Sequence, residues 1–144
     1  MRLMCVLVVS LFCLSNNAQD LKIEEEALTI HYNTYSRSDF ESVKITKAII
    51  KQSSGKGDED FIVRECPEKE WKTILSHLDK MSWEVLRNLE APTKKRLYDG
   101  AKHAVLEVSY KEKVYKTPSF DHGFPPEEIK ALVNHIVALG ESIE

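Results

Sequence analysis

Apolar and polar residues alternate along much of the chain between Leu28 and Cys66. The alternation is clear over residues 28–33 and again over 43–49, and a short apolar run starts at Phe61 and ends near Cys66. The segment 53–58 reads Ser-Ser-Gly-Lys-Gly-Asp, a composition typical of turns. Because a period of two places successive side chains on opposite faces of a sheet, these stretches predict three strands joined as an antiparallel meander.

From Pro67 the apolar residues recur at helical spacing. The stripe consists of Trp71, Ile74, Leu75, Leu78 and Met81. Proline is favoured in the first turn of a helix, and the glutamates at 68 and 70 complement the positive end of the helix dipole. The pattern therefore predicts a helix over 67–81. Apolar residues continue out of phase over 83–89, which predicts a break near Ser82 followed by a short helical turn.

Alternation returns at Ala104 and predicts a strand up to Tyr110, a tight turn and a second strand over 114–119. A last helix is predicted over 126–139, because Pro126 suits its first turn and Gly140 its end. The order β-β-β-α-β-β-α predicts an α+β domain with an antiparallel sheet of about five strands and two helices packed on one face. The predicted core consists of Trp71, Leu75, Leu78, Leu106, Val108, Ile129, Leu132 and Ile136. The other face of the sheet should be solvated, since it carries Thr29, His31, Lys44, Thr46, Glu107 and Lys116.

The first 18 residues have the three parts of a secretory signal peptide. They are a basic start at Arg2, an apolar run over 4–14 and small polar residues up to Ala18. The apolar run has about half of the ~20 residues that a membrane-spanning helix needs. We therefore predict a signal peptide over 1–18, no membrane insertion after its removal, and a secreted or periplasmic protein. The mature chain would have a loose acidic lead-in over 19–27 and a single domain over 28–144.

Charge and cysteine content narrow the classes of partner. The 144 residues include 20 basic and 23 acidic ones, and the net charge of −3 becomes −4 when Arg2 leaves with the signal. The two signs are well mixed, whereas a nucleic-acid-binding surface needs basic residues gathered in a patch, so we expect no nucleic-acid partner. Cys66 is the one cysteine outside the signal peptide. The mature chain can therefore have no internal disulfide and must rely on its hydrophobic core, and we expect a monomer.

The sequence has no motif that is specific for catalysis or for a metal ion. It lacks a Gly-x-Ser-x-Gly elbow and a glycine-rich phosphate loop, and no two of its five histidines have the i, i+4 spacing of a helical zinc site. We expect no catalytic residue, no metal site and no cofactor.

Asp121 and His122 keep an enzymatic or ligand-binding alternative open. They lie in a loop that leads into the last helix, where a carboxylate beside an imidazole could act in acid–base chemistry. In the competing interpretation, which we favour, Asp121 caps a turn, because neighbouring residues in a sequence rarely form a dyad. A concave pocket lined by His122 would favour the first interpretation.

Three segments of the chain resemble small exported proteins of Gram-negative bacteria. They are residues 119–129 (Ser-Phe-Asp-His-Gly-Phe-Pro-Pro-Glu-Glu-Ile), 98–101 (Tyr-Asp-Gly-Ala) and the Asn-Ala-Gln ending of the signal. The resemblance covers most of the mature chain, and it implies export but no activity, because that group has none assigned.

The predicted layout of strands, helix, hairpin and helix also resembles emfourin-type proteins, which are small inhibitors of thermolysin-like metalloproteases. An Arg-Ser-Gly-Gly-Phe-like turn follows the first strand in that family. Here Arg37, Ser38, Asp39 and Phe40 occupy its place, and both glycines are missing. The resemblance implies that this turn takes part in binding a metalloprotease.

Together these observations favour a non-enzymatic secreted or periplasmic binding module. Its sharper form is a protease inhibitor that acts through the turn 36–40 or the loop 93–100 on an extracytoplasmic protein such as a metalloprotease. The candidate binding residues are Arg37, Ser38, Asp39, Phe40, Asp121 and His122. Two alternatives stay open: a small hydrolase or ligand-binding protein that uses Asp121 and His122, and an envelope component that assembles through an exposed sheet edge.

Overall fold

A computed structural model describes residues 23–55 and 60–142. The predicted signal peptide and the first residues of the lead-in lie outside this range. The strands are β1 (Leu28–Tyr35), β2 (Phe40–Ile45), β3 (Ile49–Ser54), β4 (Asp60–Glu65), β5 (His103–Tyr110), β6 (Lys113–Lys116) and β7 (Phe120–Asp121). The α-helices are α1 (Glu68–Leu78) and α2 (Lys130–Glu141). Short 3-10 turns are η1 (Glu25–Ala27), η2 (Trp83–Asn88), η3 (Lys95–Leu97) and η4 (Glu127–Ile129).

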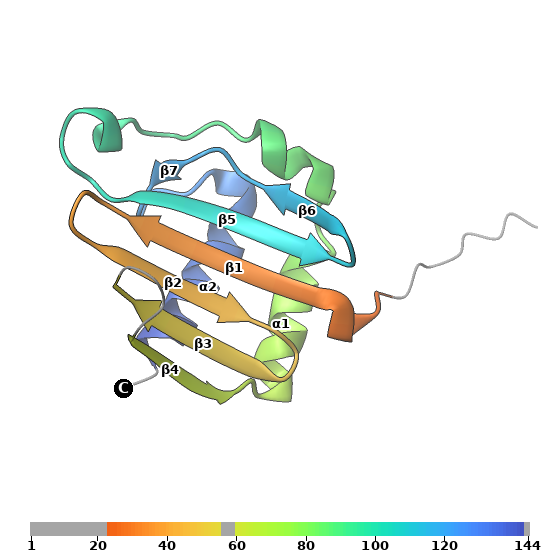
Figure 1. The fold of residues 1–144 in the computed structure, drawn as a ribbon. Coiled ribbons are helices and arrows are strands. Elements are labelled where there is room, and N and C mark those ends of the chain that lie inside the picture. The colour runs from red at the N-terminus through yellow and green to blue at the C-terminus, as the bar shows by residue number, and fades with distance from the viewer. Residues whose placement is uncertain (1–22, 56–59, 143–144) are drawn as a thin grey trace, which may run out of the picture.

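The strands form one antiparallel sheet in the order β4-β3-β2-β1-β5-β6, and β7 pairs with the start of β5. β1 lies at the centre and pairs along its whole length with β5, from Leu28 opposite Tyr110 to Tyr35 opposite His103 (Figure 1). This long-range pairing places the turn after β1 beside the loop that leads into β5. The α+β class with an antiparallel sheet is confirmed.

The sheet has seven strands, so the prediction of about five was wrong. The stretch 43–49, predicted as one strand, is the end of β2 and the start of β3. A tight turn joins them, in which the Thr46 N–H donates to the Ile49 carbonyl at 2.9 Å. The turn Thr46-Lys47-Ala48 contains neither glycine nor proline, so its composition did not mark it. β7 has only two residues, too few to show a period.

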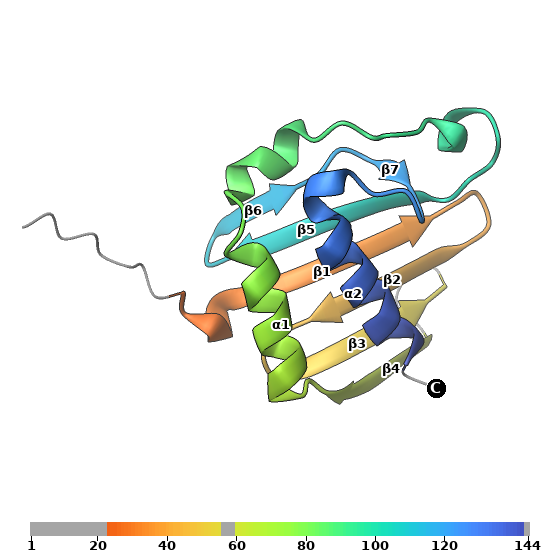
Figure 2. The ribbon, with the colours of Figure 1, turned by 180° about the vertical axis from the view of Figure 1, so that it is seen from behind.

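Both α-helices lie over the same face of the sheet (Figure 2), and neither of them covers the face seen in Figure 1. Trp71, Ile74 and Leu78 of α1 are buried, and α2 buries Leu132, Val133, Ile136 and Leu139. Of the predicted core only Leu75 is partly exposed, and it packs at the margin of the cluster. α1 ends at Leu78 rather than at residue 81, and α2 starts at Lys130 after the 3-10 turn η4 rather than at residue 126.

The last turn of α2 approaches the sheet closely at Gly140. A Cβ atom at this position would lie 2.8 Å from Cγ2 of Val43 in β2. The absence of a side chain therefore lets the end of the helix rest on the strand. The space beside this contact forms one of the two hollows described below.

Candidate functional site

A buried carboxylate anchors the loop before β5 to the rest of the fold. Asp121 is fully buried in β7. Its Oδ2 accepts hydrogen bonds from the Thr93 hydroxyl and from the Lys95 N–H at 2.8 Å, and its Oδ1 accepts from the Arg96 N–H at 2.9 Å. The Arg96 guanidinium adds an ion pair with Oδ1 at 3.1 Å and donates to the Thr93 carbonyl at 2.9 Å. Asp121 thus binds the first turn of η3 from its N-terminal side, where a negative charge is favourable.

The contacts of Asp121 decide its charge. Burial alone would raise the pKa of its carboxyl group, but the hydrogen bonds from Thr93, Arg96 and Lys95 outweigh burial and hold the pKa well below its usual range. The carboxylate is therefore ionised and saturated with donors at neutral pH. Asp121 therefore has a structural role, but its side chain binds the 93–96 loop and not its own turn. Its hydrogen bonds leave it no free lone pair for acid–base work on a substrate.

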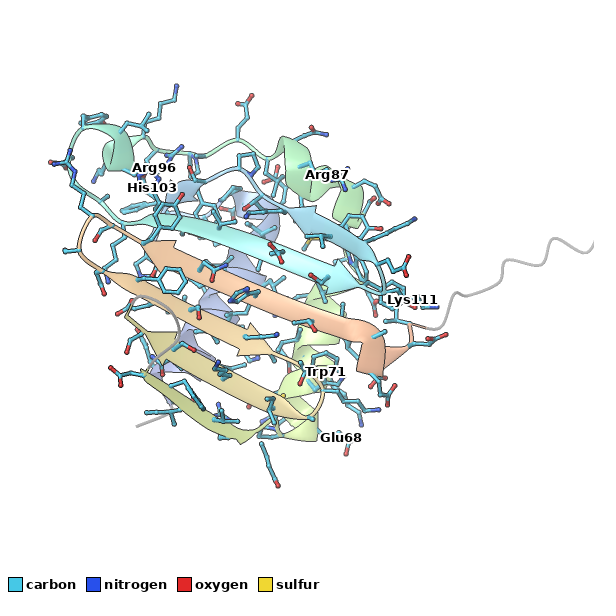
Figure 3. All side chains as sticks on the ribbon, in the orientation of Figure 1. Glu68, Trp71, Arg87, Arg96, His103 and Lys111 are labelled. Carbon is cyan, nitrogen blue, oxygen red and sulfur yellow. The ribbon has the colours of Figure 1, made fainter. Side chains whose placement is uncertain are left out.

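The anchored loop forms one wall of a groove of about 690 Å³ at the end of the sheet. The turn after β1 forms the other wall, so both segments that the sequence analysis singled out border the same groove. Tyr35 and His103 form its floor, where their rings stack at a centroid distance of 4.9 Å and an interplanar angle of 11°. Leu97 and Tyr98 stand on the rim with 65 and 77 % of their surface exposed. Figure 3 labels Arg96 and His103 at this end of the sheet, and Lys111 at the opposite end.

The four candidate residues of the turn divide into two pairs. Arg37 and Ser38 are exposed and line the groove. Asp39 instead forms an ion pair with Lys102, whose Nζ also lies 3.2 Å from Oε2 of Glu41. Phe40 begins β2 opposite Tyr35, is half-buried and does not line the groove. Asp39 and Phe40 therefore support the turn, and Arg37 and Ser38 are the ones exposed in the groove.

His122 faces a second and smaller hollow, of about 180 Å³, between the sheet and the last turn of α2. Its Nδ1 lies 2.9 Å from the hydroxyl of Tyr32, which is buried in β1. The other lining residues are Thr34, Glu41, Ser42, Val43, Gln52, Val137, Gly140 and Glu141. The imidazole of His122 thus lines a concave pocket, the observation that would favour an enzymatic or ligand-binding role for this residue.

The pocket keeps its two titratable rings neutral. Burial raises the pKa of the Tyr32 hydroxyl well above its usual range. Burial, with the nearby Lys102 ammonium, lowers the pKa of His122. A neutral imidazole that shares a proton with a neutral phenol can donate or accept one hydrogen bond to a small ligand, but Asp121 does not polarise it. The two neighbours point to different partners, Asp121 to the 93–96 loop and His122 to Tyr32, and they do not form a dyad.

The Cys66 thiol is not activated by its surroundings. Burial raises the pKa of the Cys66 thiol, which keeps it protonated and a poor nucleophile. Across residues 23–55 and 60–142, no group of three or more histidine, cysteine, aspartate or glutamate residues could hold a metal ion. Within the same ranges, no helix is long and apolar enough to cross a membrane.

Comparison with known proteins assigns no family: no protein-family model matches the chain, and no curated protein matches it. The two hollows are therefore the candidate functional sites. The sequence analysis named the loop 93–100, but it did not name Tyr35, Leu97, Tyr98 or His103 individually as binding residues. For Leu97 and Tyr98 the sequence does offer a signal. A leucine and a tyrosine stand side by side in an otherwise basic loop, and burial in the core does not explain their presence there.

Proposed function

We propose that this protein is a non-enzymatic binding module, exported to the periplasm or the medium, that holds a macromolecular partner in the groove between residues 36–38 and 96–101. The observation that carries the proposal is the convergence of these two segments, which lie about sixty residues apart in the sequence, on one groove. Loops presented on a rigid sheet are the usual carriers of binding function.

The residues of the groove have the composition of an interaction surface. Exposed tyrosine and arginine side chains are enriched at binding hot spots, and Tyr98 and Arg37 face the groove from opposite walls. The Asp121 anchor fixes the backbone of the 93–97 loop in advance, so a partner does not have to order it, and preorganisation of this kind favours affinity. Lys94 and Lys95 precede the groove residues in the same loop, and their positive charge favours an acidic partner surface.

The sharper form of the proposal is an inhibitor of a thermolysin-like metalloprotease. The resemblance to emfourin-type proteins falls on residues 37–40, and the same turn forms a wall of the groove. In this form the groove with its protruding Leu97 and Tyr98 covers the protease at a standard-sized interface.

The test uses the mature chain, residues 19–144, with a set of thermolysin-like proteases. We expect near-stoichiometric inhibition by the native chain, and about thirtyfold weaker inhibition by Leu97→Ala with Tyr98→Ala, the loss expected for a hot spot of about 2 kcal/mol. Val85→Ala with Val114→Ala is the matched control, because it removes two exposed apolar side chains away from the groove. The control should inhibit as the native chain does.

Two results would contradict the proposal in different ways. If no protease is inhibited, the inhibitor form is wrong, and the general form is then tested with the partner captured from the native secreted fraction. If a bound partner is lost equally from the groove variant and from its control, the groove is not the binding surface.

The pocket at His122 favours a second candidate function, the binding of a small ligand. It offers an imidazole, a phenol and the Gln52 amide around one cavity. Specific binding of a small polar molecule to the native chain, lost in His122→Ala and retained in the Leu97/Tyr98 variant, would support this function. Retention of the molecule by His122→Ala would exclude the pocket as its site.

A further inference from the structure

β4 forms one outer edge of the sheet, and its central residues are apolar and exposed. Phe61, Ile62 and Val63 have 57, 55 and 44 % of their surface exposed. β3 pairs with β4 on one side, and no strand of the described chain pairs with it on the other. Figures 1 and 2 show β4 at the margin of the sheet from both sides. An exposed apolar edge strand of this kind is a template for pairing with a further strand.

The opposite edge of the sheet, β6, is protected in the ways that are usual for edge strands. β6 has only four residues, with a lysine at each end. The 3-10 turn η2 packs beside it, and the Arg87 guanidinium donates to the Val114 carbonyl at 3.1 Å. Short length, lysines and a covering segment all oppose pairing with a further strand. Because β6 has these features and the centre of β4 has none of them, the two edges are not equivalent.

The backbone of β4 directs a defined set of hydrogen-bonding groups outwards. The Cys66 N–H donates to the Ala48 carbonyl at 3.0 Å, in the same register that pairs β3 with β4. In an antiparallel ladder the hydrogen-bonded residues alternate with residues whose N–H and C=O point to the other side. Since Cys66 points to β3, the N–H and C=O groups of Phe61, Val63 and Glu65 point away from it, to the free edge.

We propose that β4 pairs antiparallel with β4 of a second copy of this chain, which joins the two sheets into one continuous sheet. A two-fold axis at Ile62 places Ile62 opposite its own copy. Phe61 then lies opposite Val63 of the second copy, and their outward N–H and C=O groups form the hydrogen-bonded pairs. This proposal concerns an interface at the far edge from β5, is independent of the groove, and replaces the expectation of a monomer.

The side chains agree with this register. Asp60 lies opposite Arg64 of the second copy, and the two-fold axis repeats this pair of opposite charges at the other end of the interface. The apolar Phe61 and Val63 face each other on the open side of the sheet. A shift of two residues would instead place Phe61 opposite Glu65 and Ile62 opposite Arg64. The Arg64 guanidinium also donates to the Leu139 carbonyl at 3.3 Å and to the Ser142 hydroxyl at 3.1 Å, which holds its charge on the face of the sheet that Asp60 shares. Opposite charges at these two positions therefore favour a second copy in this register over the shifted one.

Cysteine cross-linking tests the register directly. In a Cys66→Ser background, Ile62→Cys should form a disulfide-linked dimer under mild oxidation, because the two Cα atoms at the axis lie about 4.5 Å apart in a non-hydrogen-bonded pair, within the range that a disulfide spans. Val63→Cys, one residue from the axis, and Val114→Cys, at the other edge, have native side chains with similar exposure of 44 and 46 %. Both should cross-link at least about tenfold more slowly. Equal cross-linking at the three positions would overturn the proposal.

Sedimentation of the mature chain between about 1 μM and about 1 mM measures the association itself. We expect the mean mass to rise from that of a monomer towards that of a dimer. Val63→Pro removes an outward N–H without breaking the ladder to β3, so it should abolish association, and Val114→Pro at the protected edge should not. Asp60→Lys places like charges opposite each other and should weaken association about tenfold.

A chain that stays monomeric at about 1 mM would contradict the proposal. So would dimers of Asp60→Lys as stable as those of the native chain, a result that holds even if the proline variants fail to fold.

Discussion

Asp121 and His122 are neighbours in the sequence, yet they contribute to two different hollows. Asp121 is charged, fully buried and bound by four groups of the 93–96 loop, and it thereby holds one wall of an open groove. His122 is neutral, half-buried and bound through Nδ1 to one phenol, in a pocket about a quarter of the size. Asp121 ends β7 and His122 follows it in a turn, and the two side chains bind different segments, the 93–96 loop and Tyr32 of β1.

The difference in charge, burial and number of partners indicates which of the two side chains stabilises the fold. A buried charge that is satisfied by several donors stabilises one conformation, and its removal leaves those donors unpaired. A neutral ring with one partner can exchange that partner at little cost. Asp121 therefore acts by fixing the loop that carries the exposed Leu97 and Tyr98, whereas His122 acts, if a ligand enters its pocket, by direct contact.

The largest expected effect is that of Asp121→Asn. The variant keeps the shape of the side chain but removes the charge, and it leaves the nearly buried Arg96 guanidinium without its ion pair. We expect a loss of about 3–5 kcal/mol in the free energy of unfolding, measured by urea denaturation. Asp99→Asn changes an exposed aspartate of the same loop and should cost less than about 0.5 kcal/mol. Equal losses of stability in both variants would show that Asp121 does not anchor the loop that forms the groove.

The same carboxylate predicts a loss of stability in acid. Its folded pKa is depressed, so the unfolded chain binds a proton first as the pH falls. The stabilisation is complete above the unfolded pKa of about 3.9 and decreases as the pH falls through the folded pKa.

A smaller effect is expected on the wall of the His122 pocket. Gly140→Ala places a Cβ atom 2.8 Å from Cγ2 of Val43, a stiff β-branched side chain that cannot move far. We expect a loss of about 1 kcal/mol in the free energy of unfolding, with groove binding unchanged. In the double variant with Val43→Ala the clash is absent, so a double-mutant cycle should show a favourable coupling of about 1 kcal/mol. Additive losses would show that the end of α2 does not rest on β2.

Much of this fold could be predicted from the sequence, for identifiable physical reasons. Residues 28–33 and 104–110 alternate because each strand buries one face, and that pattern depends on local sequence alone. The turn after Ile45 has no glycine or proline and left no signal in the sequence, so the number of strands was underestimated.

The site depends instead on contacts between distant segments. Arg37 and Tyr98 face one groove because the register of β1 with β5 brings Tyr35 opposite His103. The role of Asp121 depends on donors 25 to 28 residues away. No local pattern of the sequence encodes either relation, so the sequence named the turn 36–40 and the loop 93–100 as alternatives and did not predict that they share one groove.

His122 predicts a pH dependence of stability closer to neutrality than that of Asp121. The folded pKa of His122 is lowered by burial and by Lys102, so between that pKa and about 6.5 the unfolded chain holds more protons. Stability should therefore decrease as the pH falls below about 6.5, and then level off below the folded pKa. His122→Gln removes this ring and should flatten the profile in part, because His77 also has a lowered pKa. A profile unchanged by His122→Gln would show that the ring is not held in its neutral form.

The smallest expected effect on stability is that of the groove variant itself. Leu97 and Tyr98 are largely exposed, so replacing both with alanine should change the free energy of unfolding by less than about 0.5 kcal/mol. Circular dichroism during thermal unfolding measures this. A large loss would mean that the two side chains support the fold, and that their effect on binding could not be assigned to contact.

Hydrogen–deuterium exchange of the mature chain, free and in complex with its protease or captured partner, tests the central claim most directly. The account predicts that the partner slows exchange at residues 35–38 and 94–101, and leaves residues 137–141, around the His122 pocket, unchanged. Protection confined to residues 137–141, with the groove exchanging as it does in the free chain, would contradict it.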